Sequence, residues 1–270
     1  MKNDHLRIGI NLAAGGSIGW LSAADSEENV LNSYDEGRYV QQSYYGDEDG
    51  SDWNGNPWRY NPVQGGSWKG VPAEILDKDI TTQAIYVKTK PRHWATGALV
   101  DEVTMEERIT LDGSLARIRF SMRYTGSKTH APRHQELPAV FVQPQYDRLV
   151  YCDKEHEPWT NAPLLTRTPA FPNEPAHFSE AWCAWVNENG DGVGVFFPHA
   201  SEATCYRFRG GGTSDCSYIA PVQTFALKPG LEFDYEVVLA LGTAADLRAR
   251  FFKLSEATKQ SASETRSRAR

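Results

Sequence analysis

A two-residue period runs through the middle of this sequence on both sides of a short turn. From residue 103 to 111, Val, Met, Glu, Ile and Leu alternate with Thr, Glu, Arg and Thr, and from 115 to 124 apolar residues again fall on one set of alternate positions. Asp112 and Gly113 lie between the two runs. Successive side chains of a strand point to opposite faces, so this period is typical of half-buried strands. The pattern predicts an antiparallel hairpin.

Shorter segments of the same character predict an all-β chain. They are separated by turns rich in glycine and proline, and the expected strands are residues 7–12, 17–22, 83–88, 137–144, 147–152, 181–186, 193–197, 204–208, 218–227 and 232–241. Only residues 244–259 space their apolar residues as a helix does. We therefore expect one all-β domain at residues 1–260, an antiparallel two-sheet supersandwich with a short C-terminal helix, followed by a disordered polar tail at 261–270.

The formal net charge of −7 limits the classes of partner. Nucleic acids and anionic membranes attract proteins through a basic surface, so we expect neither as a partner. No run approaches the roughly 18 consecutive apolar residues that a membrane-spanning helix requires. A strongly acidic polymer is also disfavoured, unless a local basic cluster makes an exception, such as Arg92, His93, Arg133 and His134. The sequence does not indicate the oligomeric state.

The N-terminal residues lack the apolar segment of a secretory signal. We therefore expect the protein to act in the cytoplasm, or to be secreted or periplasmic after removal of a signal. The four cysteines have no CxxC spacing, which argues against a zinc ribbon or a redox pair. A bridge between Cys205 and Cys216 and free buried thiols both stay open. We expect neither a metal nor a cofactor.

The segment 29–70 has few aliphatic residues and many planar polar and aromatic side chains. Amides, carboxylates and a guanidinium suit the hydroxyl groups of a sugar, and indole rings suit its apolar face. The segment is therefore a candidate saccharide site, and its candidate binding residues are Arg38, Gln41, Gln42, Tyr45, Trp53, Trp58, Asn61, Gln64 and Trp68. The alternative is an ordered surface loop whose polar groups satisfy one another.

Glu136 is the leading catalytic candidate, because it stands near His134 at the start of a short apolar strand. Such a position can raise the pKa of a carboxyl group towards neutrality. An ion pair of Glu136 with Arg133 or Arg108 is the alternative. Asp35 and Glu180 are candidates for a second carboxylate, and Trp182 lies on the same face of its strand as Glu180 and offers a stacking surface. For elimination chemistry, the candidate bases are Tyr44, Tyr45 and His134.

A family resemblance rests on residues 15–21 followed by 29–32. A glycine-marked turn, a strand and an asparagine-containing passage resemble the start of the galactose-mutarotase-like β-supersandwich over about the first 70 residues. That family includes sugar epimerases and the sandwich domains of polysaccharide lyases and glycoside hydrolases. The resemblance implies a concave sheet that holds a saccharide, and it assigns no catalytic residue here.

We therefore expect an enzyme that cleaves a glycosidic bond in a poly- or oligosaccharide through acid and base carboxylates. A hydrolase of this kind needs two carboxyl groups about 5 to 9.5 Å apart. The alternatives are a polysaccharide lyase acting on a uronic-acid polymer, a non-catalytic carbohydrate-binding module and a sugar mutarotase.

Overall fold

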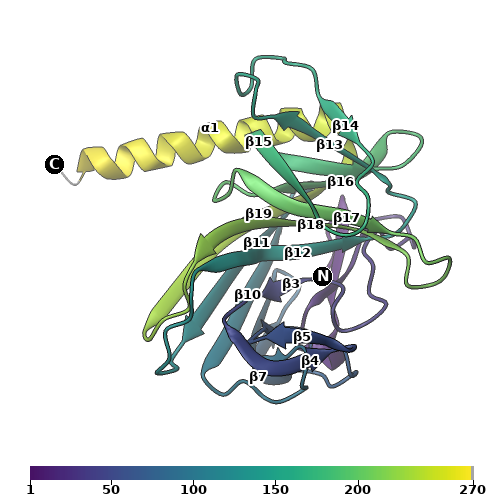
Figure 1. Cartoon of the computed structure of the whole chain (residues 1–270). Helices are drawn as coiled ribbons and strands as arrows, with labels where there is room; N and C mark the ends of the chain where they lie inside the picture. Colours follow the sequence, from purple (N-terminus) through teal and green to yellow (C-terminus); the bar gives the residue numbers. More distant parts are fainter. Residues whose placement is uncertain (269–270) are drawn as a thin grey trace.

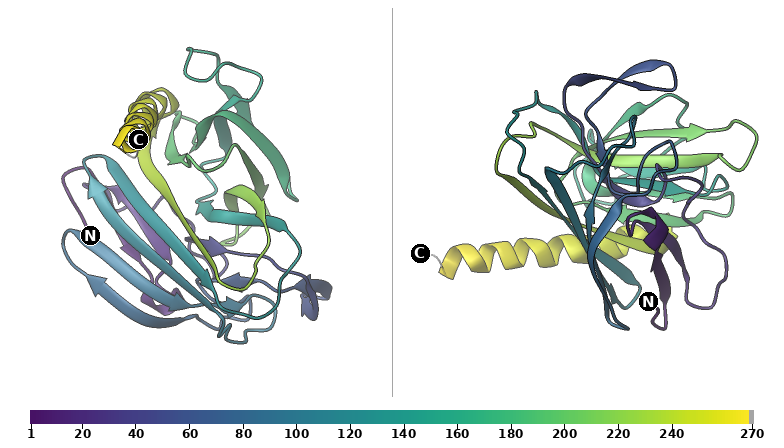
Figure 2. Two further views of the ribbon diagram at one scale, coloured as in Figure 1. Left: turned by 90° about the vertical axis from the view of Figure 1, so that its left-hand side faces the viewer. Right: turned by 90° about the horizontal axis from the view of Figure 1, so that it is seen from below.

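The computed structural model of the chain describes residues 1–268 and, within them, the side chains of residues 1–260. In this part of the chain seventeen strands belong to one continuous antiparallel sheet, which curls into two layers (Figures 1 and 2). Strand β15 (Glu174–Val186) belongs to both layers, because its first residues pair with one layer and its last residues with the other. The expected all-β sandwich is thus confirmed.

The first layer carries the candidate site. Its pairing order is β9-β6-β3-β12-β18-β17-β15, with β1 and β2 attached beside β3. The bounds are β1 (Leu6–Ile10), β2 (Ile18–Ala23), β3 (Val40–Ser43), β6 (Pro62–Val63), β9 (Arg92–His93), β12 (Arg133–Val142), β17 (Glu202–Phe208) and β18 (Cys216–Phe225). A single 3-10 turn, Leu12–Ala14, links β1 to β2.

The second layer backs the first and supplies most of the long strands. Its order is β7-β8-β10-β11-β19-β16-β15-β13-β14. The bounds are β7 (Glu74–Ile80), β8 (Ala84–Lys90), β10 (Val103–Asp112), β11 (Leu115–Tyr124), β13 (Arg148–Asp153), β14 (Leu165–Arg167), β16 (Asp191–Phe196) and β19 (Leu231–Thr243).

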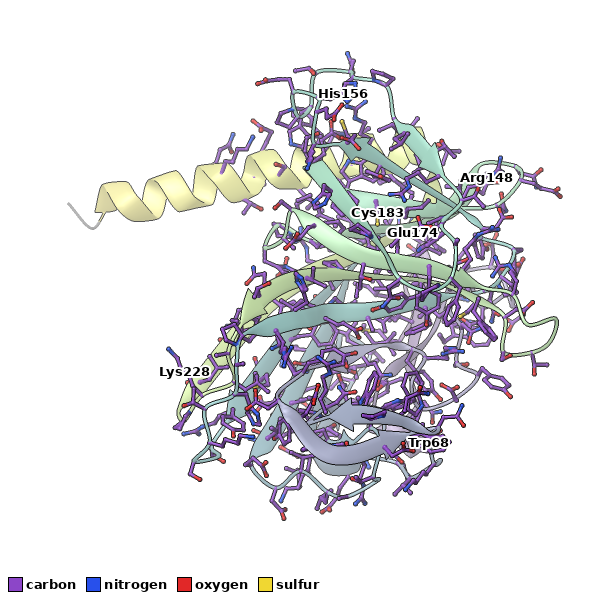
Figure 3. All side chains as sticks on the ribbon, viewed as in Figure 1. Trp68, Arg148, His156, Glu174, Cys183 and Lys228 are labelled. Carbon is purple, nitrogen blue, oxygen red and sulfur yellow. The ribbon has the colours of Figure 1, made fainter. Side chains whose placement is uncertain are left out.

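The core fills the space between the layers, as the alternation of residues predicts (Figure 3). In the β10–β11 hairpin Ile109 stands opposite Ile118, which in turn stands opposite Val237 of β19, and all three are fully buried. Burying each such side chain contributes about 1.5–3 kcal/mol. Glu107 also points inward from β10, so the hydrophobic core contains a carboxyl group.

Two elements lie outside the curled sheet. Strands β4 (Glu48–Trp53) and β5 (Asn56–Arg59) form a separate two-stranded hairpin at the edge of the first layer. Helix α1 (Ala244–Arg268) packs its first turns on β15, β16 and β19 and then leads away from the sheets (Figure 1). It overlaps the tail expected at 261–270, whose last two residues lie outside the described chain. No helix among the described residues is long and apolar enough to cross a membrane.

Candidate functional site

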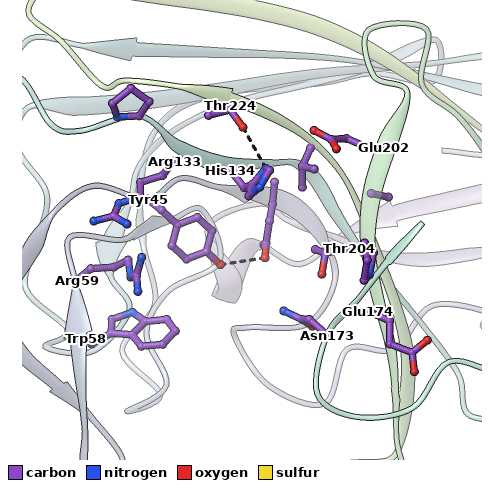
Figure 4. A pocket seen from close by; sticks show the side chains of 15 residues that line it. Tyr45, Trp58, Arg59, Arg133, His134, Asn173, Glu174, Glu202, Thr204 and Thr224 are labelled. Carbon is purple, nitrogen blue, oxygen red and sulfur yellow. Dashed lines mark hydrogen bonds between the residues drawn. The ribbon is translucent and has the colours of Figure 1, made fainter. Parts of the chain in front are cut away.

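A cleft lies on the face of the first layer that points away from the core. It consists of two cavities of about 270 Å³ and about 620 Å³, the larger shown in Figure 4. Tyr45, Trp58, Glu136 and Asn173 line both cavities, so they stand where the two meet. Ligand pockets commonly occupy about 300–1,000 Å³, and this cleft is large enough for a small saccharide.

Strand alternation places the side chains of β3 and the residues after it. Gln41, Ser43 and Tyr45 line the smaller cavity, whereas Val40 and Tyr44 point into the core. Gln41 is held in place, because its amide donates to the carbonyl groups of Glu36 and Arg38 and its oxygen accepts from the amide of Gly65.

A bulge in β12 directs further side chains into the cleft. The register of β12 against both neighbouring strands shifts after Glu136, so that Glu136, Ala139 and Phe141 all line the smaller cavity. Without the shift, every second residue after Glu136 would face the cavity, and Val140 would replace Phe141. Bulges often occur beside active sites, where they re-aim a side chain in this way.

Glu136 is a half-buried carboxyl group held by two tyrosines. Its Oε1 accepts hydrogen bonds from the hydroxyl of Tyr45 at 2.9 Å and from that of Tyr218 at 2.6 Å. Burial raises the pKa of Glu136, and the hydrogen bonds from Tyr218, Tyr45 and Ser43 oppose that rise. A carboxyl group with a raised pKa at a cavity wall is suited to accepting and returning a proton.

Tyr45 and Tyr218 serve as hydrogen-bond donors to Glu136 rather than as bases. Burial, with the nearby charge of Glu136, raises the pKa of both Tyr45 and Tyr218 well above the ordinary value of 10.0. Both hydroxyl groups therefore keep their protons at neutral pH and hold Glu136 in one orientation.

Three indole rings form one wall of the smaller cavity. Trp53 contacts Trp58 edge-on at 4.7 Å between ring centroids and Trp94 at 6.0 Å. The indole nitrogen of Trp58 donates to the side-chain oxygen of Asn61 at 3.2 Å. Trp53 is 36% exposed, so it is available to an incoming ligand. Such a wall suits the apolar face of a sugar ring.

Among the described side chains, Arg38 is the only cationic one that lines the smaller cavity. Its guanidinium group lies over the ring of Phe141 at 5.0 Å and donates to the carbonyl group of Ser214 at 3.4 Å. The buried Nε has no hydrogen-bond partner, and no carboxylate among the described residues forms an ion pair with Arg38.

Three of the residues proposed for sugar contact or catalysis belong to the core instead. Tyr44 donates its hydroxyl proton to Gln42 at 2.8 Å, and Gln64 donates to Glu107 at 2.8 Å. Each of these side chains is at most 1% exposed, and none lines the cleft. Gln42, Gln64 and Tyr44 therefore satisfy polar groups inside the sandwich and leave the candidate site.

Neither candidate second carboxylate lines the cleft together with Glu136. Glu180 is fully buried, accepts from the indole nitrogen of Trp182 at 2.8 Å and forms an ion pair with Arg248 on α1. Asp35 accepts from the amide of Gly37 at 2.9 Å and lines neither cavity. Glu180, Trp182 and Asp35 therefore line neither cavity of the cleft.

Trp68 and His134 have different positions relative to the cleft. The half-exposed Trp68 donates to the carbonyl group of Ala95 at 2.9 Å and lines neither cavity (Figure 3). His134 is exposed at the larger cavity, and its Nδ1 lies 3.1 Å from the hydroxyl of Thr224. His134 thus stays near Glu136, whereas Trp68 does not contribute to the cleft wall.

Several cleft residues escape the sequence reasoning. Trp94, Tyr206, Tyr218 and Asn173 come from four separate segments. The sequence does predict a strand at Tyr218, with this side chain on the face away from the core. Its contact with Glu136, however, becomes known only from the pairing of β18 with β12. Among the side chains described, no group of three or more His, Cys, Asp or Glu residues is arranged to hold a metal.

Comparison with known proteins gives matches in structure alone. No protein-family model and no curated protein sequence matches the chain. A galactose mutarotase related enzyme from Lactobacillus acidophilus aligns at a TM-score of 0.58 and 13% identity over 89% of this chain and 96% of that one. A galactose mutarotase-like protein from Lactobacillus casei aligns at a TM-score of 0.57 and 12% identity over 89% and 98% of the two chains.

An alpha-galactosidase from Lactobacillus brevis also aligns, at a TM-score of 0.51 and 8% identity. The match covers 90% of this chain but only 39% of the alpha-galactosidase. The mutarotase-like proteins, in contrast, are matched over nearly their whole length. The chain therefore has the galactose-mutarotase-like fold.

Proposed function

We propose that this protein is a sugar mutarotase, or a closely related epimerase, in which Glu136 transfers a proton at the anomeric centre. The main support is the position of Glu136, whose carboxyl group lies at the junction of the two cavities and accepts hydrogen bonds from two tyrosine hydroxyls. The whole-length likeness to mutarotase-like proteins supports the same assignment.

The proposed reaction needs one base and one acid. Glu136 accepts the proton of the anomeric hydroxyl, the bond from the anomeric carbon to the ring oxygen breaks, and the ring oxygen takes up a proton. His134 lines the cleft beside Glu136 and is the group placed to donate that proton. Closure of the ring on the other face of the aldehyde reverses these transfers and yields the other anomer.

Glycosidic cleavage is the second candidate, and the size of the larger cavity favours it. That cavity contains two further carboxylates, Glu174 and Glu202, on the wall opposite Trp58 (Figure 4). However, Glu174 forms an ion pair with Arg167, and Glu202 lies 3.9 Å from His177. A hydrolase needs a second carboxylate free to act across the scissile bond, so we rank cleavage below mutarotation.

The test is the interconversion of anomers measured by polarimetry and by NMR exchange on a panel of aldoses. We expect Glu136→Gln to reduce the rate about 10²- to 10⁴-fold, because a positioned general base contributes that much. Glu74→Gln, an exposed glutamate on β7, is the matched control and should leave the rate unchanged.

The same preparations distinguish the alternatives. Release of reducing ends from oligosaccharides, lost in Glu136→Gln, would support glycosidic cleavage instead. Saccharide binding that is unaffected by Glu136→Gln, with no reaction on any substrate, would support a binding module and refute the proposed reaction.

A further inference from the structure

Three arginines along the cleft lack a carboxylate partner. Arg38 lines the smaller cavity, and Arg59 and Arg133 line the larger one. Most cationic side chains of the strand layers form ion pairs, including both lysines of β8 and all three arginines of β11. None of the three cleft arginines forms an ion pair with any described residue, although the chain carries a net charge of −7.

Two of these arginines also contain buried donor atoms without a partner. The Nε atoms of Arg38 and Arg133 are both buried and make no hydrogen bond with the described residues. Leaving a buried charged donor without a hydrogen bond costs about 1–3 kcal/mol or more, so such donors usually bind an acceptor. The third, Arg59, lies over the ring of Trp58 at 6.0 Å, which holds its guanidinium group at the cleft wall.

The carboxylates that share the cleft do not neutralise these arginines. Glu174 and Glu202 lie on the wall opposite Arg59 and Arg133 (Figure 4). Glu174 is already paired with Arg167, and Glu136 accepts hydrogen bonds from Tyr45 and Tyr218 rather than from an arginine. The wall of the larger cavity that carries Arg59 and Arg133 therefore has positive charge without an ion-pair partner, as does Arg38 in the smaller cavity.

We infer that the saccharide bound in this cleft is anionic and carries a carboxylate, as a uronic acid or a short chain of uronic acid residues does. A guanidinium fork matches a carboxylate with two parallel hydrogen bonds. The three arginines line two different cavities and do not converge on a single point, which fits charges spread along a sugar chain better than one phosphate group.

This inference rests on the proposed function, and binding measurements test it separately from catalysis. Isothermal titration calorimetry of the full chain would compare D-glucuronate and D-galacturonate with D-glucose and D-galactose, and a trimer of galacturonate with a neutral trimer. We expect the uronates to bind at least about tenfold more tightly than their neutral counterparts, with affinity falling as salt rises.

Arginine variants locate the effect. Arg38→Gln and Arg133→Gln should each reduce uronate affinity about tenfold and neutral-sugar affinity by a smaller factor, so that the preference for the uronate falls. Arg108→Gln, an exposed arginine on β10 outside the cleft, is the matched control. Arg38→Lys keeps the charge but loses the fork, so it should restore only part of the preference.

The outcomes separate the inference from the proposed reaction. Equal affinity for acidic and neutral sugars, or a preference that both glutamine variants retain, would overturn the inference even if neutral sugars are mutarotated. Tighter binding of D-glucose 6-phosphate than of every uronate would also overturn it, because the anion would then be a phosphate. Arginine-dependent uronate binding without conversion of any sugar would support the inference and refute the reaction.

Discussion

Glu107 places an ionisable group in the hydrophobic core, and its titration affects stability. The side chain is 1% exposed, its Oε2 accepts from Gln64 at 2.8 Å and its Oε1 has no partner. Burial raises the pKa of Glu107 from an ordinary value of 4.5 to about 8. Between these two values the folded protein keeps a proton that the unfolded chain releases. The contribution to stability is therefore complete below pH 4.5 and is lost as the pH rises through 8.

Glu107→Gln should remove this pH dependence. Each pKa unit corresponds to about 1.4 kcal/mol, so we expect the free energy of unfolding of the wild-type protein to fall by on the order of 4 kcal/mol between pH 5 and pH 9 relative to the variant. Urea unfolding at a series of pH values measures the difference. Equal pH profiles for the wild type and Glu107→Gln would refute the assignment.

Tyr218 should tune the pH dependence of the reaction. Its hydroxyl group donates to Glu136 at 2.6 Å and thereby lowers the pKa of that carboxyl group. Tyr218→Phe removes this hydrogen bond, so the pKa of Glu136 rises further and a base at this position is protonated at higher pH. We expect the acid limb of the rate profile to move upward by about one pH unit.

The control for this shift is Tyr206→Phe. Tyr206 lines the same cavity, but its hydroxyl group forms no hydrogen bond with Glu136. The pH profile of Tyr206→Phe should therefore match that of the wild type. A shift of the same size in both variants would mean that cavity polarity, and not the hydrogen bond of Tyr218, sets the pKa.

Among the elements, the β4–β5 hairpin has the most direct relation to the cleft. It carries Trp53 and Trp58, and its base is tied to the first layer where Asp49 contacts Nε2 of His93 at 2.8 Å. Asp47 accepts from the amide of Ala131 at 2.9 Å and ties the preceding residues as well. The position of the indole wall thus depends on a few polar contacts.

Asp49→Ala should loosen the hairpin without unfolding the protein. We expect saccharide affinity to fall about three- to tenfold, equivalent to about 1 kcal/mol, while the melting temperature changes little, because the hairpin lies outside the main core. Titration calorimetry and thermal melting measure the two effects. Asp79→Ala, at an exposed position of β7, is the control, and unchanged affinity in Asp49→Ala would contradict this role.

The elements differ in how far the sequence predicts them, for physical reasons. The β10–β11 hairpin is predictable because each residue alternates between core and surface. The β4–β5 hairpin has almost no buried residue and hence no such period. Its one signal is the pair Asn54 and Gly55, both with positive φ, which is a strong hairpin marker.

The candidate site is predictable only in part for a related reason. Residue chemistry along the sequence points to Glu136, Arg38 and the indoles of Trp53 and Trp58, all of which line the cleft. Strand pairing between distant segments brings Tyr218 to Glu136, and no local pattern encodes it. Polar chemistry alone also failed to separate cleft residues from Gln42 and Gln64, which satisfy buried groups.

For the whole molecule, the ion pair between Arg248 and Glu180 joins helix α1 to the strands. The Nε of Arg248 lies 2.9 Å from Glu180, which also accepts from the amide of Trp159 and the indole of Trp182. Arg248→Ala would leave a buried carboxylate without its counter-charge, so we expect a loss of about 3–5 kcal/mol in the free energy of unfolding.

Chemical denaturation measures this loss, and a second variant isolates its cause. In the double variant Arg248→Ala with Glu180→Gln no charge stays buried, so much of the lost stability should return. Lys253→Ala, at an exposed position of the same helix, is the control. A double variant as unstable as Arg248→Ala would show that packing, and not the unpaired charge, causes the loss.

All four cysteines, Cys152, Cys183, Cys205 and Cys216, are buried and unbridged, so Cys205 and Cys216 form no disulfide. Figure 3 shows Cys183 within the fold. A sulfur atom enclosed by packed strands meets a thiol-reactive dye only when the surrounding strands open. The rate of labelling would therefore follow the opening of the sandwich directly, and the native chain carries its own reporter of unfolding without any engineered probe.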